Sequence, residues 1–392
     1  MDRKLFYLVS FLLSFSVVLS YSLGVYAVDY YDYGEFHFVI RQVIAVGFGI
    51  LIMWILSQIP ADKLIMQLGF FILFGAIFLL IIMQFLPDSL ATSAGGAKRW
   101  IRLFGFSIAP SEYFKIGFIT FLAWSFSRRF VGQHRESLWS EILTLLPYII
   151  VLFGFIIAFI AVMQNDLGQS VLMAVIFGIM LLFAGGSFKL FGVIVLSAIL
   201  LFSVAVMSSA NRIARVKMWW SSVQDYVLSF LPQNIAENIR IEALPEPYQI
   251  YYSLSAISSG GFFGKGIGDG TIKLGFLSEV HTDIVLAGLC EELGLLGLLI
   301  FVIIFALILQ RILRIANRTN SHIYALFCIG VCVSFGFSFL INAFGVTGII
   351  PIKGIAVPFL SYGGSAILSS CIALGMVLSI SKANDSAQKA TQ

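Results

Sequence analysis

The sequence Leu277-Ser278-Glu279-Val280-His281-Thr282-Asp283 joins the longest polar segment of the chain to a hydrophobic run that extends to about Leu309. It places an imidazole, a hydroxyl and a carboxylate next to one another where water meets lipid. We therefore interpret Asp283 as the chemical centre of the protein, and we include His281 and Thr282 among its candidate binding residues.

The composition indicates a protein that crosses a membrane many times. Hydrophobic residues make up 59% and charged residues 11% of the 392 residues, whereas a soluble domain carries about 25% charged residues. The net charge of +4 is too small to indicate nucleic-acid binding. The cysteines lie in apolar runs without a histidine cluster, so we interpret them as packing residues rather than metal ligands: Cys290, Cys328, Cys332 and Cys371.

Hydrophobic runs long enough to span a bilayer recur along the whole chain, and a spanning helix needs about 20 apolar residues. The expected fold is an all-α polytopic membrane protein, a single membrane domain over residues 1–392 with about ten transmembrane helices. The first run is too long for a signal peptide and is expected to be retained. The expected spans are 5–27, 39–58, 64–86, 110–127, 142–163, 167–184, 188–207, 283–310, 322–343 and 361–381.

Lysine and arginine in the short connections fix the expected orientation, because cytoplasmic loops carry an excess of these residues. Both termini are then cytoplasmic, and residues 208–282 form one large extracytoplasmic loop. Within it, Arg212 to Leu231 mixes basic and aromatic residues, as in a helix lying in the interface plane. Residues 382–392 form a cytoplasmic tail, which we expect to be disordered. The expected location is the cytoplasmic (inner) membrane.

Basic residues on the outer side are exceptions to the charge rule. They are either solvated surface or a binding region for an anionic lipid headgroup, above all a diphosphate. Interleaved tryptophans favour positions at headgroup level. The basic candidates are Lys98, Arg99, Arg212, Arg215, Lys265, Lys273 and Lys353.

Asp283 has two interpretations. As a helix N-cap it would have a structural role, and as a general base it would stand at the outer mouth of a cavity. Glu291 and Glu292 follow on the same expected helix at about 80° and 180° from Asp283, so both cannot share its face. We expect one of them to be paired structurally.

Three other segments contain polar groups at membrane depth. Glu112 and Lys115 are either a self-neutralising i, i+3 pair or part of the cavity of Asp283. The glycines of 260–270 indicate tight turns or close backbone packing more than phosphate binding. The run 341–365, which includes Ser361, contains two prolines and a Gly-Gly pair. It is expected to be a broken or re-entrant segment that closes the site.

Together these segments resemble the SEDS family of bacterial cell-shape and division proteins. The resemblance covers about residues 95 to 375, with the motifs in the family's order. They are Gly95–Trp100 (NGAKRW in the family), Pro110–Lys115 (PSE-x-x-K), Gln164–Gly168 (QPDLG), Arg212–Arg215 (R-x-x-R), Tyr248-Gln249 (YQ), Gly264–Lys273 (G-x-G-x-G…K), His281–Asp283 with Glu291-Glu292 (HTD…EE) and Pro351–Ser365 (P-x-KG…P-x-x-SYGGS).

The resemblance implies a peptidoglycan glycosyltransferase that polymerises lipid II on the outer face of the cytoplasmic membrane. It implies a class B penicillin-binding protein as transpeptidase partner, together with other division proteins. Asp283 matches the family's proposed catalytic aspartate, and the basic candidates would bind diphosphates. No metal-ligand spacing is readable, although a divalent cation could share that task. Lys353-Gly354 and the Glu279-Val280-His281 sequence are more similar to the division branch than to the elongation branch.

Departures from the family pattern affect loop conformation more than chemistry: Asn165 and Ser278 replace prolines, and Gly95 replaces an asparagine. The alternatives are an elongation polymerase, a flippase of lipid-linked precursor and a non-catalytic scaffold. A transporter should show inverted repeats and a charged path to the inner side, and neither is evident in the sequence.

Overall fold

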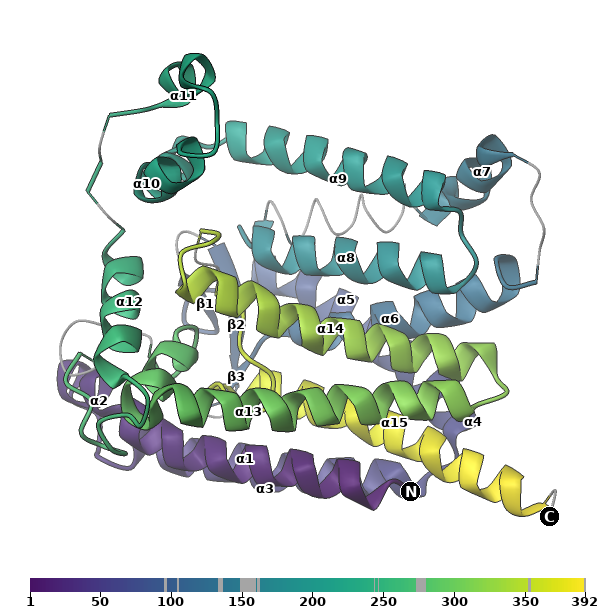
Figure 1. Ribbon diagram of the computed structural model, residues 1–392. Coiled ribbons are helices and arrows are strands. Elements are labelled where there is room, and N and C mark those ends of the chain that lie inside the picture. The colour runs from purple at the N-terminus through teal and green to yellow at the C-terminus, as the bar shows by residue number, and fades with distance from the viewer. Residues whose placement is uncertain are drawn as a thin grey trace.

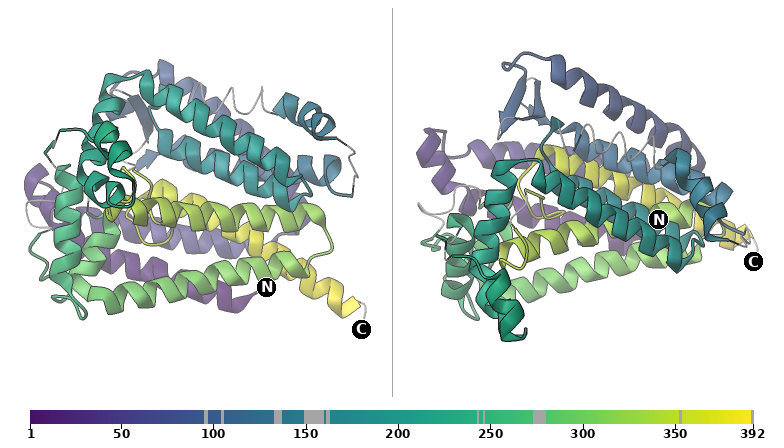
Figure 2. Two further views of the ribbon diagram at one scale, coloured as in Figure 1. Left: turned by 45° about the horizontal axis from the view of Figure 1, so that its top comes forward. Right: turned by 90° about the horizontal axis from the view of Figure 1, so that it is seen from above.

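The computed structural model describes residues 1–94, 97–103, 106–132, 137–148, 160, 163–242, 244–245, 247–272, 280–351 and 354–390. Long helices run side by side in a bundle (Figure 1), which Figure 2 shows from two other directions. In this part of the chain seven helical segments are long and apolar enough to cross a membrane. They are α1 (Arg3–Leu23), α3 (His37–Gln58), the continuous run α4 (Ala61–Lys63), η1 (Leu64–Leu68) and α5 (Gly69–Phe85), α9 (Phe188–Met207), α13 (Val285–Arg318), α14 (His322–Val346) and α15 (Gly364–Ala390).

Two more helices occupy expected spans. The first, α6 (Pro110–Arg129), is mostly buried, and the second, α8 (Leu167–Phe183), is apolar but shorter. The expected span 142–163 lies largely outside the described residues, and α7 (Leu138–Tyr148) covers its beginning. The chain is thus a polytopic helical membrane protein.

Both termini lie at one end of the bundle (Figure 1). The expectation of a disordered tail after Ser381 is wrong, because α15 continues to Ala390. The extension is tied to the neighbouring helix: the Asn384 side chain donates to the Ile315 carbonyl at 3.3 Å. The other end of the bundle carries the shorter elements α2 (Val25–Tyr31), α10 (Ala210–Leu228), α11 (Gln233–Ile239) and α12 (Tyr248–Gly260).

A small sheet occupies the connection at 87–109, which the sequence patterns had not indicated. β1 (Ala91–Ala94), β2 (Ala97–Leu103) and β3 (Phe106–Ile108) are antiparallel in the order β1-β2-β3. Ala97 and Ile101 of β2 are buried, whereas the positions between them carry Lys98 and Arg99. A register shift in the β1–β2 pairing between Thr92 and Ser93 interrupts the period of two, so the strands show no regular alternation in the sequence.

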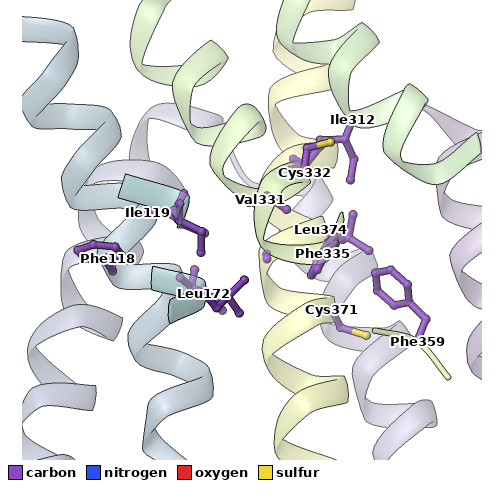
Figure 3. Packing of buried hydrophobic residues seen from close by; sticks show 14 of the residues in the cluster. Phe118, Ile119, Leu172, Ile312, Val331, Cys332, Phe335, Phe359, Cys371 and Leu374 are labelled. Carbon is purple, nitrogen blue, oxygen red and sulfur yellow. The ribbon is translucent and has the colours of Figure 1, made fainter. Parts of the chain in front are cut away.

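The apolar core surrounds α15, which is the most deeply buried of the long helices. Leu374 and Cys371 of α15 pack close to Phe335 of α14 and to Phe359 of the connection between these helices (Figure 3). All four cysteines are free and buried, which confirms that they are packing residues.

The described residues between α14 and α15, 347–351 and 354–363, are non-helical, as the prolines predicted. Residues 356–359 and Ser361 of this connection line a cavity inside the bundle. Helix α13 is interrupted as well: Gly294 has φ 67° and ψ −169°. The single unbroken helix expected after Asp283 is therefore two helical segments.

Candidate active site

Three consecutive backbone carbonyls fix the segment that carries Asp283. The His281 carbonyl accepts from the Tyr362 N–H at 2.8 Å. The Thr282 carbonyl accepts from the Ser361 hydroxyl at 2.7 Å. The Asp283 carbonyl accepts from the Asn342 amide at 2.7 Å. Since every residue of the His-Thr-Asp sequence is tied through its main chain, the backbone that carries the Asp283 carboxylate is held in place by α14 and the α14–α15 connection.

Asn342 joins the two sides of this arrangement. Its side-chain Nδ2 also donates to the Ile355 carbonyl at 2.8 Å, and the residue is buried. One amide thus bridges the segment before α13 and the connection before α15. An unpaired carbonyl in a buried setting costs about 1–3 kcal/mol, so this bridge is a strong local constraint.

The Asp283 carboxylate lies against Gly354. A Cβ atom placed on Gly354 would come within 2.7 Å of Asp283 Oδ2, closer than two such atoms can approach. Asp283 itself is partly exposed. The absence of a side chain at residue 354 therefore lets the loop cover one side of the carboxylate while another side stays open. The N-cap of α13 is Ile284, so the N-cap interpretation of Asp283 is wrong.

Phe359 and Ser361 keep the α14–α15 connection in place. Phe359 has φ +65°, which is uncommon for a bulky residue. Its ring is buried and meets Phe335 edge-on at a centroid distance of 5.0 Å. Ser361 Oγ, besides donating to Thr282, accepts from the Val357 N–H at 2.8 Å. The Ser361 hydroxyl therefore links the Asp283 segment to the α14–α15 connection, and the substrate contact expected from the sequence stays a prediction.

His281 belongs to an aromatic cluster. Its ring lies 4.6 Å from that of Phe38 and 5.3 Å from that of Tyr362. Burial lowers the pKa of His281 from 6.5 to about 4, because the charged imidazolium would lose its hydration. His281 is thus neutral near pH 7 and packs against Phe38 and Tyr362 beside the Asp283 segment.

Glu291 organises the glycine-rich loop. Its Oε1 accepts from the backbone N–H groups of Thr271 and Ile272 at 2.7 and 2.9 Å, and Lys265 Nζ lies 3.5 Å away. Both Glu291 and Glu292 are fully buried, and Glu292 accepts from the Ser22 hydroxyl of α1. The expectation of structural pairing is thereby confirmed.

The glycine-rich loop joins α13 at its interruption. Lys265 N–H and Gly266 N–H donate to the carbonyls of Glu291 and Glu292 at 3.0 and 2.9 Å. A Cβ on Gly264 would lie 2.1 Å from the Glu292 carbonyl oxygen, so only glycine permits this approach. The loop is a backbone packing element, which confirms the interpretation of close packing.

A second polar cluster forms around the turn before α8. Arg99 donates to the carbonyls of Gln164 and Asn165, both at 2.9 Å. Arg212 at the start of α10 donates to Asn165 Oδ1 at 2.7 Å and to the Ala205 carbonyl at 2.7 Å. Two guanidinium groups from distant segments thus meet at Asn165. Asn165 has φ +50°, a conformation that proline cannot adopt.

The second cluster continues inward to the buried pair on α6. Gln169 donates to Glu112 Oε1 at 2.9 Å, and Glu112 Oε2 lies 2.8 Å from Lys115 Nζ. Asp166, the N-cap of α8, interacts electrostatically with Arg99 and with this pair. Burial raises the pKa of Asp166 above its usual value, against the opposing effect of Arg99.

A cavity of about 30 Å³ lies beside the second cluster, with room for about two water molecules. Glu112, Lys115 and Ser361 are among its lining residues, whereas Asp283 is not. Asp283 and the Glu112–Lys115 pair therefore do not share this cavity.

The remaining basic candidates differ in whether they form hydrogen bonds or ion pairs within the protein. Lys98 donates to the Leu86 carbonyl and lies 3.5 Å from Asp88. Arg215 is exposed and makes no hydrogen bond or ion pair with the described residues. Lys273 and Lys353 lie outside the described residues. In the part of the chain that the structure describes, no group of three or more His, Cys, Asp or Glu residues could hold a metal ion.

Sequence reasoning missed Gln169 and Ser22. Gln169 could have been noticed as a polar residue early in an apolar helix. Ser22 lies 270 residues from Glu292, and nothing in the sequence indicates that contact.

The motifs that make up both clusters are matched by one family model. It describes a cell cycle protein family, FtsW/RodA/SpoVE, and it matches residues 2–386. The chain belongs to this family. Members of the FtsW/RodA/SpoVE family include a Helicobacter pylori protein named "Probable peptidoglycan glycosyltransferase FtsW", 50% identical over 97% of this chain and 98% of its own.

Other FtsW/RodA/SpoVE relatives are more distant. A Trichlorobacter lovleyi protein with the same name is 35% identical over 79% of this chain and 74% of its own. Stage V sporulation protein E of Bacillus subtilis is 29% identical over 97% of each chain. The chain is therefore similar to the FtsW branch of the family.

Solved structures share the fold. A chain from the structure "Structural coordination of polymerization and crosslinking by a peptidoglycan synthase complex" has a TM-score of 0.69 at 21% identity, covering 98% of both chains. The rod shape determining protein RodA of Thermus thermophilus has a TM-score of 0.62 at 20% identity, covering 97% of this chain and 96% of its own.

Proposed function

We propose that this protein is a peptidoglycan glycosyltransferase that polymerises lipid II into glycan strands during septal synthesis. The observation that carries the proposal is the partly exposed carboxylate of Asp283, which stands on a segment whose three consecutive carbonyls accept hydrogen bonds and which has Gly354 against it. The names of the FtsW relatives support the reaction and the division role.

The proposed topology has ten spans, both termini in the cytoplasm and the protein in the inner membrane. Residues 208–282 form the large extracytoplasmic loop and residues 382–392 the cytoplasmic end, in one membrane domain. The common location of the termini supports an even number of spans (Figure 1). Helix α10 is seen nearly end-on while α9 runs across the view, which supports an interfacial orientation for α10.

In the proposed reaction Asp283 acts as the general base. It takes the proton of the acceptor GlcNAc 4-hydroxyl, and the oxygen forms a bond to the anomeric carbon of the growing chain. The bond from that carbon to the diphosphate breaks, the configuration inverts, and undecaprenyl diphosphate leaves. A general base accelerates a reaction through its position as well as through its basicity. The hydrogen-bonded main chain around Asp283 supplies the position.

The leaving diphosphate needs positive charge. Arg215 is the least engaged candidate among the described basic residues, since it is exposed and makes no hydrogen bond or ion pair with them. Arg99 and Arg212 are already engaged in part at Asn165, and Lys265 is shared with Glu291. Lys98, Lys273 and Lys353 complete the proposed set, and Thr282 remains a candidate for substrate contact.

The proposed partner is a class B penicillin-binding protein that cross-links the strands, with other division proteins. The likeness to a chain of a peptidoglycan synthase complex, in which polymerisation and crosslinking are coordinated, supports a partner of this kind. The broken helices suit a flippase as a second candidate, but the anchored acid and the buried Glu112–Lys115 pair favour catalysis.

The decisive experiment compares the purified full-length protein with Asp283→Asn, using fluorescent lipid II with and without the partner. We expect the variant to lose glycan polymerisation while keeping its melting temperature. Asp225→Asn, an exposed carboxylate of α10 paired with Arg240 at the surface, is the matched control and should stay active. Full activity of Asp283→Asn would reject the general base.

A further inference from the structure

A second cavity lies at the end of the bundle where the termini are. It is about 470 Å³ in volume and is bounded by the start of α1, the end of α3 and the end of α15. Its lining has two kinds of surface: Arg3, Lys382 and Gln58 are polar, whereas Phe6, Tyr7 and Trp54 are aromatic.

Met1, Arg3 and Lys382 bring three cationic groups to the cavity, and among the described residues only the Met1 amino group is neutralised, by Asp385. Lys382 Nζ donates to the Gln58 carbonyl at 3.4 Å and to Gln58 Oε1 at 3.1 Å, both uncharged oxygens. Neither Lys382 nor Arg3 forms an ion pair with a carboxylate in the part of the chain that the structure describes. The cavity therefore keeps a net positive charge.

The nearest acidic side chains are engaged elsewhere. Asp2 accepts from the Leu5 N–H at 3.0 Å and lies 3.5 Å from Arg311. Asp385 contacts the amino group of Met1 at 2.8 Å. These contacts hold both carboxylates in positions where they do not pair with Arg3 or Lys382.

The aromatic side of the cavity faces outward from the bundle. Trp54 is 51% and Tyr7 66% exposed, and both stand near the ends of membrane-spanning helices. Aromatic side chains at such positions sit at headgroup level in a bilayer. The cavity thus offers cations to a headgroup and an aromatic wall to the glycerol and upper acyl chains of the same molecule.

We propose that this cavity binds a phospholipid with an anionic phosphodiester headgroup, with the phosphate between Arg3 and Lys382. The two surface types match the two parts of such a lipid, and a free phosphate would leave the aromatic wall uncovered. The leaflet is the one at the termini, which is the cytoplasmic leaflet in the proposed topology. The site is separate from Asp283 and does not depend on the proposed reaction.

The test uses the full-length protein in vesicles and measures quenching of tryptophan fluorescence by brominated phosphatidylglycerol and brominated phosphatidylcholine. We expect the wild type to prefer the anionic lipid. Each lipid-facing cation contributes about fivefold in affinity, so Arg3→Gln/Lys382→Gln should lose most of the preference. Trp54→Phe should lose the lipid-specific part of the quenching, because Trp54 lines the cavity and reports on it directly.

The matched control is Lys4→Gln/Arg318→Gln, which removes the same charge from exposed positions at the same end of the bundle that do not line the cavity. It should keep the wild-type preference. Three results would each overturn the proposal: no preference in the wild type, an equal loss in the control, or displacement of the lipid by inorganic phosphate. Should the double variant fail to insert, Trp54→Phe and Lys382→Gln alone decide the question.

Discussion

Replacing Asn342 by leucine tests whether a buried amide positions Asp283, the proposed general base. Leucine has a similar volume but cannot donate to the carbonyls of Asp283 and Ile355, which now accept at 2.7 and 2.8 Å. Each lost bond leaves a buried carbonyl unpaired at about 1–3 kcal/mol. The free energy of unfolding should therefore fall by roughly 2–6 kcal/mol, and the apolar contacts of the leucine should offset part of this loss.

The effect on catalysis should exceed the effect on stability. Without the bridge, the segment before α13 separates from the loop around Gly354, and the carboxylate loses its fixed position. A displacement of about 1 Å can cost about 100-fold in rate. We expect kcat for lipid II polymerisation to fall by that order while KM changes little, since Asn342 is buried and is not expected to touch substrate.

A matched variant separates positioning from general destabilisation. Val331→Ala lies on the same helix, is buried (Figure 3) and should cost about 2 kcal/mol through two lost methyl groups. Its kcat should remain close to that of the wild type once the protein is folded. Wild-type turnover in Asn342→Leu, or an equal loss of turnover in Val331→Ala, would refute the positioning role.

Two further predictions concern the same site. Gly354→Ala should lower kcat at least tenfold, because its Cβ would meet Asp283 Oδ2 at 2.7 Å, whereas Gly364→Ala, with its nearest atom at 3.9 Å, should be nearly silent in the same assay. Because the pKa of His281 is lowered in the folded protein, its contribution to the free energy of unfolding should be fully present above pH 6.5. That contribution should be lost as the pH falls through about 4, since the unfolded chain takes up a proton more readily than the folded chain. The His281→Phe variant should lose less free energy of unfolding on acidification than the wild type, by about 3 kcal/mol at most. Equal slopes of melting temperature against pH in the variant and the wild type between pH 7 and 5 would contradict this.

Much of the candidate site was predictable from sequence because its residues are unusual for their surroundings. Carboxylates, prolines and paired glycines stand out in a chain with 11% charged residues. That contrast identified Asp283, the Glu112–Lys115 pair and the broken segment before α15. The roles were less predictable. Ser361 and His281 were candidates for substrate binding, but the Ser361 hydroxyl donates to the Thr282 carbonyl and the His281 ring packs against Phe38 and Tyr362.

The sequence by itself determined the membrane class, most of the spans and the position of the acid, because hydrophobic length and charge placement act locally along the chain. Only the tertiary structure determined which polar groups already have hydrogen-bond partners within the protein. Arg99 and Arg212 meet at Asn165, Glu292 meets Ser22, and Asn342 meets the carbonyl of Asp283. These partners are tens to hundreds of residues apart, and a hydrogen bond over such a separation depends on how the helices pack, which no local pattern records.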